Sequence, residues 1–358
     1  MKLLLCTLEY PPQIGGVANY YENLIQAWPD QEAWMILDNN QNELLCRRGP
    51  YPWRKTIFSL YKQLAGHSFD LIFLGQILPL GLAALCLNIF IPFKFGVFLH
   101  GMDLTFALIT PRKRFLAGLI LKKSKIIVCA NSKVRDILLD HWPQLKDRVV
   151  LINPGAKVGQ ADPVTQAQFR QRYQLTGKKI LFSIGRLVKR KGFDQVIRAL
   201  EGCGDQNFVY LLAGDGPEKD NLQALAAASA VAEKIIFTGV LTEAEKWSCL
   251  DLCDIFITTS RELGADFEGF GIVYLEANLM GKPVIAGRSG GVADAVIDNF
   301  NGLLVDPENI NDISQSLKKL FIDQDLANKL GEQGRTRAQQ DFAWSGQAEK
   351  LSQKLTGK

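Results

Sequence analysis

Two carboxylates stand on either side of a glycine-rich turn late in the chain. Glu268 and Glu276 are separated by seven residues, and the turn between them runs from Gly269 to Gly271. An apolar stretch from Ile272 to Leu279 follows at once and predicts a helix. Glycines let backbone amides come close to a ligand, and a helix N-terminus favours an anion. The segment therefore predicts a site for phosphate groups or sugar hydroxyls.

A second glycine-containing turn follows the same helix. Gly281 to Pro283 ends the helix, and Val284 to Ala286 reads as a short buried strand. Ser289, Gly290 and Gly291 then offer a further set of open amides before another helix. We therefore expect two helix N-termini to converge on one ligand.

These segments resemble a known family. The run EGFGIVYLEA, followed by GKPVIA and by GG, is similar to the signature of retaining glycosyltransferases of the GT-B fold, the large family four. The Gly-Ala-Asp run before Glu268 and the IVYLEA after it most resemble bacterial GDP-mannose-dependent mannosyltransferases that act on lipids. The other interpretation is a Rossmann-type helix whose two glutamates are solvated surface charges, because most glutamates are exposed.

The resemblance implies a role for each residue of this segment. Glu268 would hydrogen-bond hydroxyls of the transferred sugar, and Glu276 would hydrogen-bond the ribose of the donor. The amides of Gly16, Phe270 and Gly271 would stabilise the leaving diphosphate, which carries most of the developing charge. The donor-binding residues implied are Gly15, Gly16, Gly185, Val240, Glu268, Gly269, Phe270, Gly271, Ile272 and Glu276.

A basic run follows a strand predicted from Lys179 to Ile184. It holds four cations in the six residues from Arg186 to Lys191, and a solvated turn would explain such a run. The family carries an Arg and a Lys five positions apart here, and Arg186 and Lys191 match them. The resemblance therefore implies that both bind the donor diphosphate, through charge-assisted contacts of the strong kind.

Two features of the first half match the family more weakly. A strand from Lys2 to Thr7 leads through a loop with Gly15 and Gly16 into a helix, which points amides at phosphate. In the family this loop touches the donor diphosphate or the acceptor, although a tight turn needing positive φ would explain both glycines nearly as well. His100 begins a His-Gly-Met-Asp run after a predicted strand, and it resembles the family's histidine near the donor sugar and phosphate. A hydrogen-bonded structural histidine is the alternative.

Three further positions bear on the comparison. Val240 follows a strand whose backbone faces the nucleobase in the family. Asp294 departs from the family, which usually has Glu there, so the helix-capping role of that position is in doubt. Asp323 to Asp325 is the only Asp-x-Asp run, and it lies between predicted helices as a cap. We therefore expect no metal site.

The composition is that of a globular protein large enough for two domains. The 358 residues are 47% hydrophobic and 22% charged, a length that suits two cores. Seven scattered cysteines without a paired Cys-x-x-Cys argue against a disulfide framework or a zinc site and fit a reducing cytoplasm. The net charge of +4 is mild, and no Lys/Arg stripe interleaved with aromatics points to nucleic acid.

Short apolar strands alternate with helices along both halves, which predicts an α/β protein with two doubly wound parallel sheets. We assign residues 1–157 to a Rossmann-like acceptor domain and residues 175–341 to a Rossmann-like nucleotide-sugar domain. The polar stretch from Gly159 to Lys179 reads as the linker. In the GT-B fold that the resemblance implies, the two domains face each other and a last helix, 342–358, packs back onto the first. The uncharged run 71–93 is long enough to span a bilayer, but its Gly, Pro and Asn residues favour strand, helix and strand.

Basic clusters stand at both ends of an apolar helix expected from Arg112 to Lys123. Such a helix can lie on an anionic bilayer, or it can be a packing helix with solvated ends. The basic loop from Arg47 to Lys55, which carries Trp53, lies nearby in sequence. Together they predict a cytoplasmic protein that contacts the inner membrane peripherally.

The resulting hypothesis is a retaining glycosyltransferase that moves a hexose, best matched by mannose from GDP-mannose, to a lipid-linked or saccharide alcohol. Its catalytic residues would be His100, Arg186, Lys191 and Glu268, with no cofactor and no metal. Two alternatives stay open: a UDP-glucose or other UDP-sugar transferase with a soluble acceptor, and a GT-B protein that binds without catalysis. A NAD-dependent dehydrogenase is disfavoured, because no full Gly-x-Gly-x-x-Gly with a following acid is present.

Overall fold

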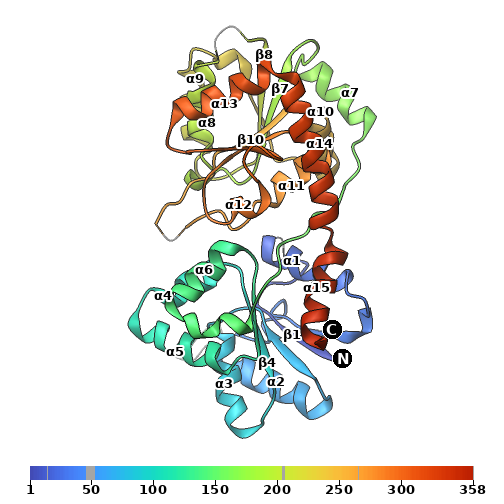
Figure 1. Cartoon of the computed structure of the whole chain (residues 1–358), viewed down its shortest axis with the longest axis vertical. Coiled ribbons are helices and arrows are strands. Elements are labelled where there is room, and N and C mark those ends of the chain that lie inside the picture. The colour runs from blue at the N-terminus through green and yellow to red at the C-terminus, as the bar shows by residue number, and fades with distance from the viewer. Residues whose placement is uncertain (14, 46–52, 204–205, 265, 358) are drawn as a thin grey trace. The chain divides into compact units, whose positions relative to one another are not determined.

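The computed structural model describes residues 1–13, 15–45, 53–203, 206–264 and 266–357. The chain divides into two compact units, which are described separately. Unit 1 comprises Met1–Gly155 and Trp344–Lys358, and unit 2 comprises Ala156–Ala343. Figure 1 shows the chain coloured from its blue N-terminus to its red C-terminus.

The sheet of unit 1 consists of β1 (Leu3–Cys6), β2 (Trp34–Leu37), β3 (Leu71–Leu74), β4 (Phe95–Leu99), β5 (Ile126–Cys129) and β6 (Val149–Leu151). The strands are parallel and lie in the order β2-β1-β3-β4-β5-β6. The order reverses between β1 and β3, because β2 lies on one side of β1 and every later strand on the other. All residues of β1, β3, β4 and β5 are buried, which explains why their sequences are continuously apolar.

The helices of unit 1 are α1 (Gly16–Gln26), α2 (Arg54–Gly66), α3 (Leu80–Phe90), α4 (Met102–Leu108), α5 (Pro111–Lys123), α6 (Ser132–His141) and α15 (Trp344–Thr356), with 3-10 turns at Gln31–Ala33 and Pro143–Arg148. The last of them, α15, packs against α1. Ala348 and Leu351 of α15 share a hydrophobic cluster with Leu3 and Leu5 of β1. The C-terminal helix is therefore part of the core of unit 1.

The sheet of unit 2 consists of β7 (Lys179–Ile184), β8 (Phe208–Ala213), β9 (Ile235–Gly239), β10 (Ile255–Thr258), β11 (Val284–Gly287) and β12 (Gly302–Val305). These strands are parallel in the order β12-β11-β10-β7-β8-β9, so the order reverses between β7 and β10. The helices are α7 (Pro163–Arg172), α8 (Phe193–Glu201), α9 (Lys219–Ala227), α10 (Glu243–Leu252), α11 (Ile272–Leu279), α12 (Val292–Ala295), α13 (Ile310–Ile322) and α14 (Gln324–Asp341), with 3-10 turns η3 (Lys189–Lys191) and η4 (Ala232–Lys234).

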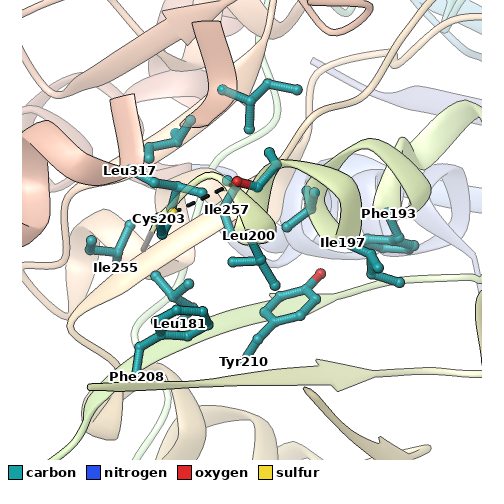
Figure 2. Packing of buried hydrophobic residues seen from close by; sticks show 14 of the residues in the cluster. Leu181, Phe193, Ile197, Leu200, Cys203, Phe208, Tyr210, Ile255, Ile257 and Leu317 are labelled. Carbon is teal, nitrogen blue, oxygen red and sulfur yellow. Dashed lines mark hydrogen bonds between the residues drawn. The ribbon is translucent and has the colours of Figure 1, made fainter. Parts of the chain in front are cut away.

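The core of unit 2 lies on both faces of its sheet. Successive residues of a strand point to opposite faces, and the clusters follow that alternation. Leu181 and Ile257 pack with α8 and α13 on one face, as Figure 2 shows. Phe182 and Phe256 pack with α10 and α11 on the other. Each such side chain contributes about 1.5–3 kcal/mol by leaving water, so the two faces together hold the sheet that carries the site.

The predicted elements are confirmed in most places. The strands predicted at 71–74, 95–99, 126–129 and 149–151 and the helix at 272–279 have the same bounds in the structure. The uncharged run 71–93 forms β3 and α3, as predicted, and among the described residues no helix combines the length and apolarity needed to cross a membrane. The interpretation of 159–179 as linker is wrong in part: Asp162 caps α7, which packs on α10. An Asp followed by a Pro is a signal for the start of a helix, but the polar composition of this stretch favoured the linker interpretation.

Candidate active site

The carboxyl edge of the unit 2 sheet gathers charged side chains around Glu268. The reversal of strand order between β7 and β10 is where open α/β sheets bind ligands. The turn η3 follows β7, and Ser260 follows β10. Glu268 lies between these two segments with 8% of its surface exposed.

Three donors hold the Glu268 carboxylate. Lys191 Nζ and Arg190 Nη1 lie 2.7 Å and 2.8 Å from Oε2, and the Ser260 hydroxyl donates to the same oxygen at 3.0 Å. Burial alone would raise the pKa of Glu268, but Lys191 and Arg190 outweigh it and lower that pKa to about 2. The carboxylate is therefore ionised at neutral pH. All three contacts engage Oε2, and Oε1 has no partner among the described residues, so Oε1 can accept from a ligand hydroxyl.

Arg190 is a residue of this site that the sequence analysis missed. Its Nε lies 3.0 Å from Asp266 Oδ1 while its Nη1 holds Glu268, so it ties two carboxylates of one loop to the turn after β7. Arg190 and Glu268 are 78 positions apart in the chain. In the sequence, Arg190 was visible only as a cation in addition to Arg186 and Lys191. The fold is what brings it next to Asp266 and Glu268.

The two predicted diphosphate ligands differ in their surroundings. Lys191 is engaged with Glu268, whereas Arg186 is exposed and makes no ion pair with any residue the structure describes. The stem of Lys191 passes Gly185, where an added Cβ would lie 3.5 Å from Lys191 Cε. That is ordinary van der Waals contact. Gly185 is therefore not required for space within unit 2.

Glu276, the second carboxylate of the segment, is partly buried. Lys246 of α10 lies 2.9 Å from its Oε1, and Lys246 also pairs with Glu243 at 2.9 Å. Burial raises the pKa of Glu276 and Lys246 only partly opposes that effect. The sequence analysis missed Lys246, whose sole signal was a lysine in the second turn of a helix.

The turn between the two glutamates offers the amides that the sequence predicts. Gly269, Phe270 and Gly271 donate no backbone hydrogen bond within the described chain. Gly271 has φ of 79°, and an added Cβ would lie 2.4 Å from the Tyr274 ring, so backbone and packing both require glycine. Phe270 is buried, and Ile272 is the first residue of α11. This N-terminus of α11 is therefore open to an anion.

Two of the three amides predicted to be open in the second turn are bonded, so that prediction is wrong for Gly290 and Gly291. The Gly290 N–H donates to Glu262 Oε1 at 2.9 Å, and the Gly291 N–H donates to the Glu268 carbonyl at 2.9 Å. These two bonds connect the second turn to the loop that leads into the first turn. The helix that follows, α12, is only four residues long. One helix N-terminus, that of α11, remains for a ligand.

The other predicted positions of unit 2 are Val240, Asp294 and Asp323. Val240 follows β9 and is 74% exposed. Asp294 lies in the first turn of α12, where its carbonyl accepts from Arg337 Nη2 at 2.7 Å. Asp323 caps α14 by accepting from the Leu326 N–H, as predicted.

His100 follows β4 in unit 1 and lies among aromatic side chains. Its Nε2 is 2.8 Å from the Tyr21 hydroxyl, which donates to the Gly75 carbonyl at 2.9 Å. Because that hydroxyl has one hydrogen, His100 Nε2 must be the donor and Nδ1 the acceptor. Burial lowers the pKa of His100 to about 3, so the ring is neutral at pH 7.

Backbone strain does not explain the glycine pair at the start of α1, of which Gly15 is the N-cap and Gly16 the first residue. Gly15 has φ of 175°, an extended conformation open to any residue, and Gly16 is helical without positive φ. An added Cβ on Gly16 would meet no atom within 4 Å. The tight-turn interpretation of these glycines is therefore wrong, and space next to the start of α1 is free within the described unit.

Two further predictions meet the structure as follows. The basic loop Arg47 to Lys55 lies outside the described residues up to position 52, and Arg54 begins α2. In the ranges that the structure describes, no three His, Cys, Asp or Glu side chains form a group suited to a metal ion.

Two six-stranded parallel sheets, one with a carboxylate and cation cluster at its switch point, are the architecture of the GT-B fold with two Rossmann-like domains. Residues 165–337 match the family described as Glycosyl transferases group 1. The chain therefore contains a domain of this family and is a glycosyltransferase.

Similar proteins agree in fold and class. The chain is 27% identical over 390 residues to the GDP-mannose-dependent alpha-(1-6)-phosphatidylinositol monomannoside mannosyltransferase of Mycolicibacterium smegmatis, covering 99% of this chain and 98% of the relative. A protein of the same description from Mycobacterium tuberculosis is 26% identical over 380 residues, with the same coverage. The crystal structure of Anabaena HepE in complex with UDP and glucose has a TM-score of 0.79, 17% identity and 100% coverage of both chains.

Proposed function

We propose that this enzyme transfers mannose from GDP-mannose to a hydroxyl of a lipid-linked acceptor, with retention at the anomeric carbon and without a metal. The observation that carries the proposal is the ionised Glu268 beside Lys191 at the carboxyl edge of the unit 2 sheet. The choice of donor and acceptor is supported by the mannosyltransferases that the chain resembles along nearly its full length.

Stabilisation of the leaving diphosphate is the largest task of such a site, because most of the developing charge is there. Arg186 is exposed and unpaired within the described chain, so it is available to an incoming phosphate. Lys191 would bridge the diphosphate and Glu268. The free amides from Gly269 to Gly271 would add neutral donors at the start of α11.

The carboxylates would orient the donor. Glu268 Oε1 would accept from hydroxyls of mannose, since its Oε2 is fixed by Lys191 and Arg190. Glu276 would accept from the ribose. In unit 1 the neutral His100 would meet the sugar through Nδ1, and the departing phosphate would take the proton of the acceptor hydroxyl on the same face.

We also propose that unit 1 attaches to an anionic membrane surface through α5. Its inner face packs through Ala117 and Ile120, whereas Phe115 and Leu119 on its outer face are 66% and 41% exposed. A groove of about 500 Å³ beside this outer face is lined by Pro111, Arg114, Phe115, Gly118, Leu119, Lys122, Asp140, His141 and Trp142. Apolar side chains next to cations suit the boundary between lipid head groups and acyl chains.

The experiment is a donor screen with the purified chain. Nucleotide release would be measured from GDP-mannose and from UDP-glucose, each with and without a bacterial lipid extract. The proposal expects release from GDP-mannose that the extract stimulates. Preference for UDP-glucose with a soluble sugar would support the first alternative, and GDP binding without any release would support an inactive binding protein.

A further inference from the structure

The four residues that follow β10, at positions 259–262, hold separate parts of the unit 2 site. The second of them donates to Glu268, and the fourth accepts from the Gly290 N–H. The first and the third, Thr259 and Arg261, contact the basic turn η3 instead. Residues 259–262 therefore connect the catalytic carboxylate, the second glycine turn and η3.

Three backbone carbonyls of η3 and of the residue that ends it accept hydrogen bonds from this segment. The Arg261 Nε–H donates to the Lys189 carbonyl at 3.0 Å, and the Arg261 backbone N–H donates to the Arg190 carbonyl at 2.8 Å. The Thr259 hydroxyl donates to the Gly192 carbonyl at 2.7 Å. The backbone of the turn is therefore fixed by the segment that leaves β10.

The contact between the two segments is close enough to require a glycine. Gly192 has φ of 68°, and an added Cβ would lie 2.0 Å from the Thr259 carbonyl oxygen. Any other residue at this position would push η3 away from residues 259–262. The position of η3 thus depends on that segment.

The Arg261 guanidinium is also anchored outside η3. Its Nη2 lies 3.1 Å from both carboxylate oxygens of Asp194 in the first turn of α8, and its Nη1 lies 3.5 Å from Glu308 Oε1. The side chain is only 11% exposed. A planar guanidinium can serve a carbonyl and two carboxylates at once, whereas a lysine ammonium is a point charge without this fork. Arg261 therefore holds η3 in one orientation relative to α8.

We infer that Arg261 is a positioning residue for the donor diphosphate: it holds the carbonyls of η3 so that the Lys191 ammonium stays beside Glu268, where the diphosphate binds. This inference rests on the proposed function, which assigns Lys191 to the diphosphate. Arg261 acts through Lys191, because its own guanidinium is engaged by a carbonyl and two carboxylates. Charge stabilisation depends on donors that are fixed before the reaction, and a displacement of about 1 Å costs about 10²-fold in rate.

The test compares Arg261→Lys with a matched control, Arg335→Lys, in the full chain. Arg335 also donates to two carbonyls, those of Leu279 and Met280, but it does so at the C-terminus of α11, the end opposite to the anion-binding turn. Affinities for GDP and for UDP would be measured by isothermal titration calorimetry. We expect Arg261→Lys to weaken the nucleoside diphosphate that wild type binds by about tenfold or more, and Arg335→Lys to leave it within about twofold.

A double-mutant cycle with Lys191→Ala separates positioning from a general loss of stability. If Arg261 acts through Lys191, Arg261→Lys should weaken the nucleotide by no more than about twofold in the Lys191→Ala background, because the group that it positions is already absent. Equal weakening in both backgrounds, or wild-type affinity in Arg261→Lys alone, would overturn the inference.

The choice of nucleotide separates this inference from the proposed function. A chain that binds UDP and turns over UDP-glucose would refute the proposed donor, whereas the same cycle measured with UDP would still test Arg261. A chain that transfers mannose from GDP-mannose, but whose cycle shows equal weakening in both backgrounds, would refute the inference alone.

Discussion

At the scale of single residues, Arg186 and Lys191 are expected to do the work that a metal does in other transferases. Arg186→Ala and Lys191→Ala should each lower kcat/KM for the donor by about 10²-fold or more, because transition-state charge on the diphosphate would lose a partner. Lys189→Ala in the same turn is the control, since Lys189 is exposed and not assigned to the donor. Near-normal turnover in both variants would remove the diphosphate assignment.

Lys246 is expected to set the pH range in which the donor binds. Lys246→Ala removes the cation 2.9 Å from Glu276, so the pKa of Glu276, already raised by burial, should rise further. The donor KM of the variant should therefore increase first at the acid end of a profile from about pH 5 to about pH 8. Glu243→Gln removes the 80% exposed partner of Lys246 and should leave the profile in place. An unshifted profile in Lys246→Ala would show that Glu276 does not act as an ionised acceptor.

Glu268 should also make folding stability depend on pH. Its pKa falls from 4.5 to about 2 in the folded protein, so it stabilises the fold above pH 4.5 and this stabilisation is lost as pH falls toward 2. The effect is on the order of 3 kcal/mol. The free energy of unfolding of wild type minus that of Glu268→Gln should shrink across this range. A difference that stays constant with pH would mean that Lys191 and Arg190 do not depress the pKa.

At the scale of elements, the proposed attachment of α5 to an anionic membrane can be tested directly. Changing Arg112, Arg114 and Lys122 to Gln should release the chain from anionic vesicles at low salt, because each cation near such a surface contributes about 1 kcal/mol. The matched control changes three exposed cations of unit 2, Lys318, Lys319 and Lys329, to Gln. If both triple variants bind vesicles equally, or wild type ignores them, α5 is a packing helix only.

The elements of the sheets were predictable because parallel strands buried on both faces have continuously apolar sequences. β3, β4 and β5 illustrate this, and α11 was predictable from its glycine turn and apolar run. Helix α7 was not, because its sequence is polar and only its Asp162 cap marked it. The prediction that the Gly290 and Gly291 amides are free was wrong for another reason. They donate to Glu262 and Glu268, and those contacts depend on the path of the preceding loop, which the local sequence does not encode.

At the scale of the whole molecule, the donor signature could be predicted because it lies within one short run of sequence. The partners that tune it could not. Arg190 and Lys246 reach Glu268 and Glu276 from 78 and 30 positions away. Such contacts depend on strand order, which places the ends of β1 and β3, or of β7 and β10, side by side.

The measurement that tests the account most directly is transfer of radiolabelled mannose from GDP-mannose into a bacterial lipid extract, by the purified chain in EDTA. We expect labelled lipid from which α-mannosidase releases the label, since retention keeps the α configuration of the donor. We also expect UDP-glucose to give far less product. Label transferred only from UDP-glucose, a β-linked product, or transfer that EDTA abolishes and Mg²⁺ restores would contradict it.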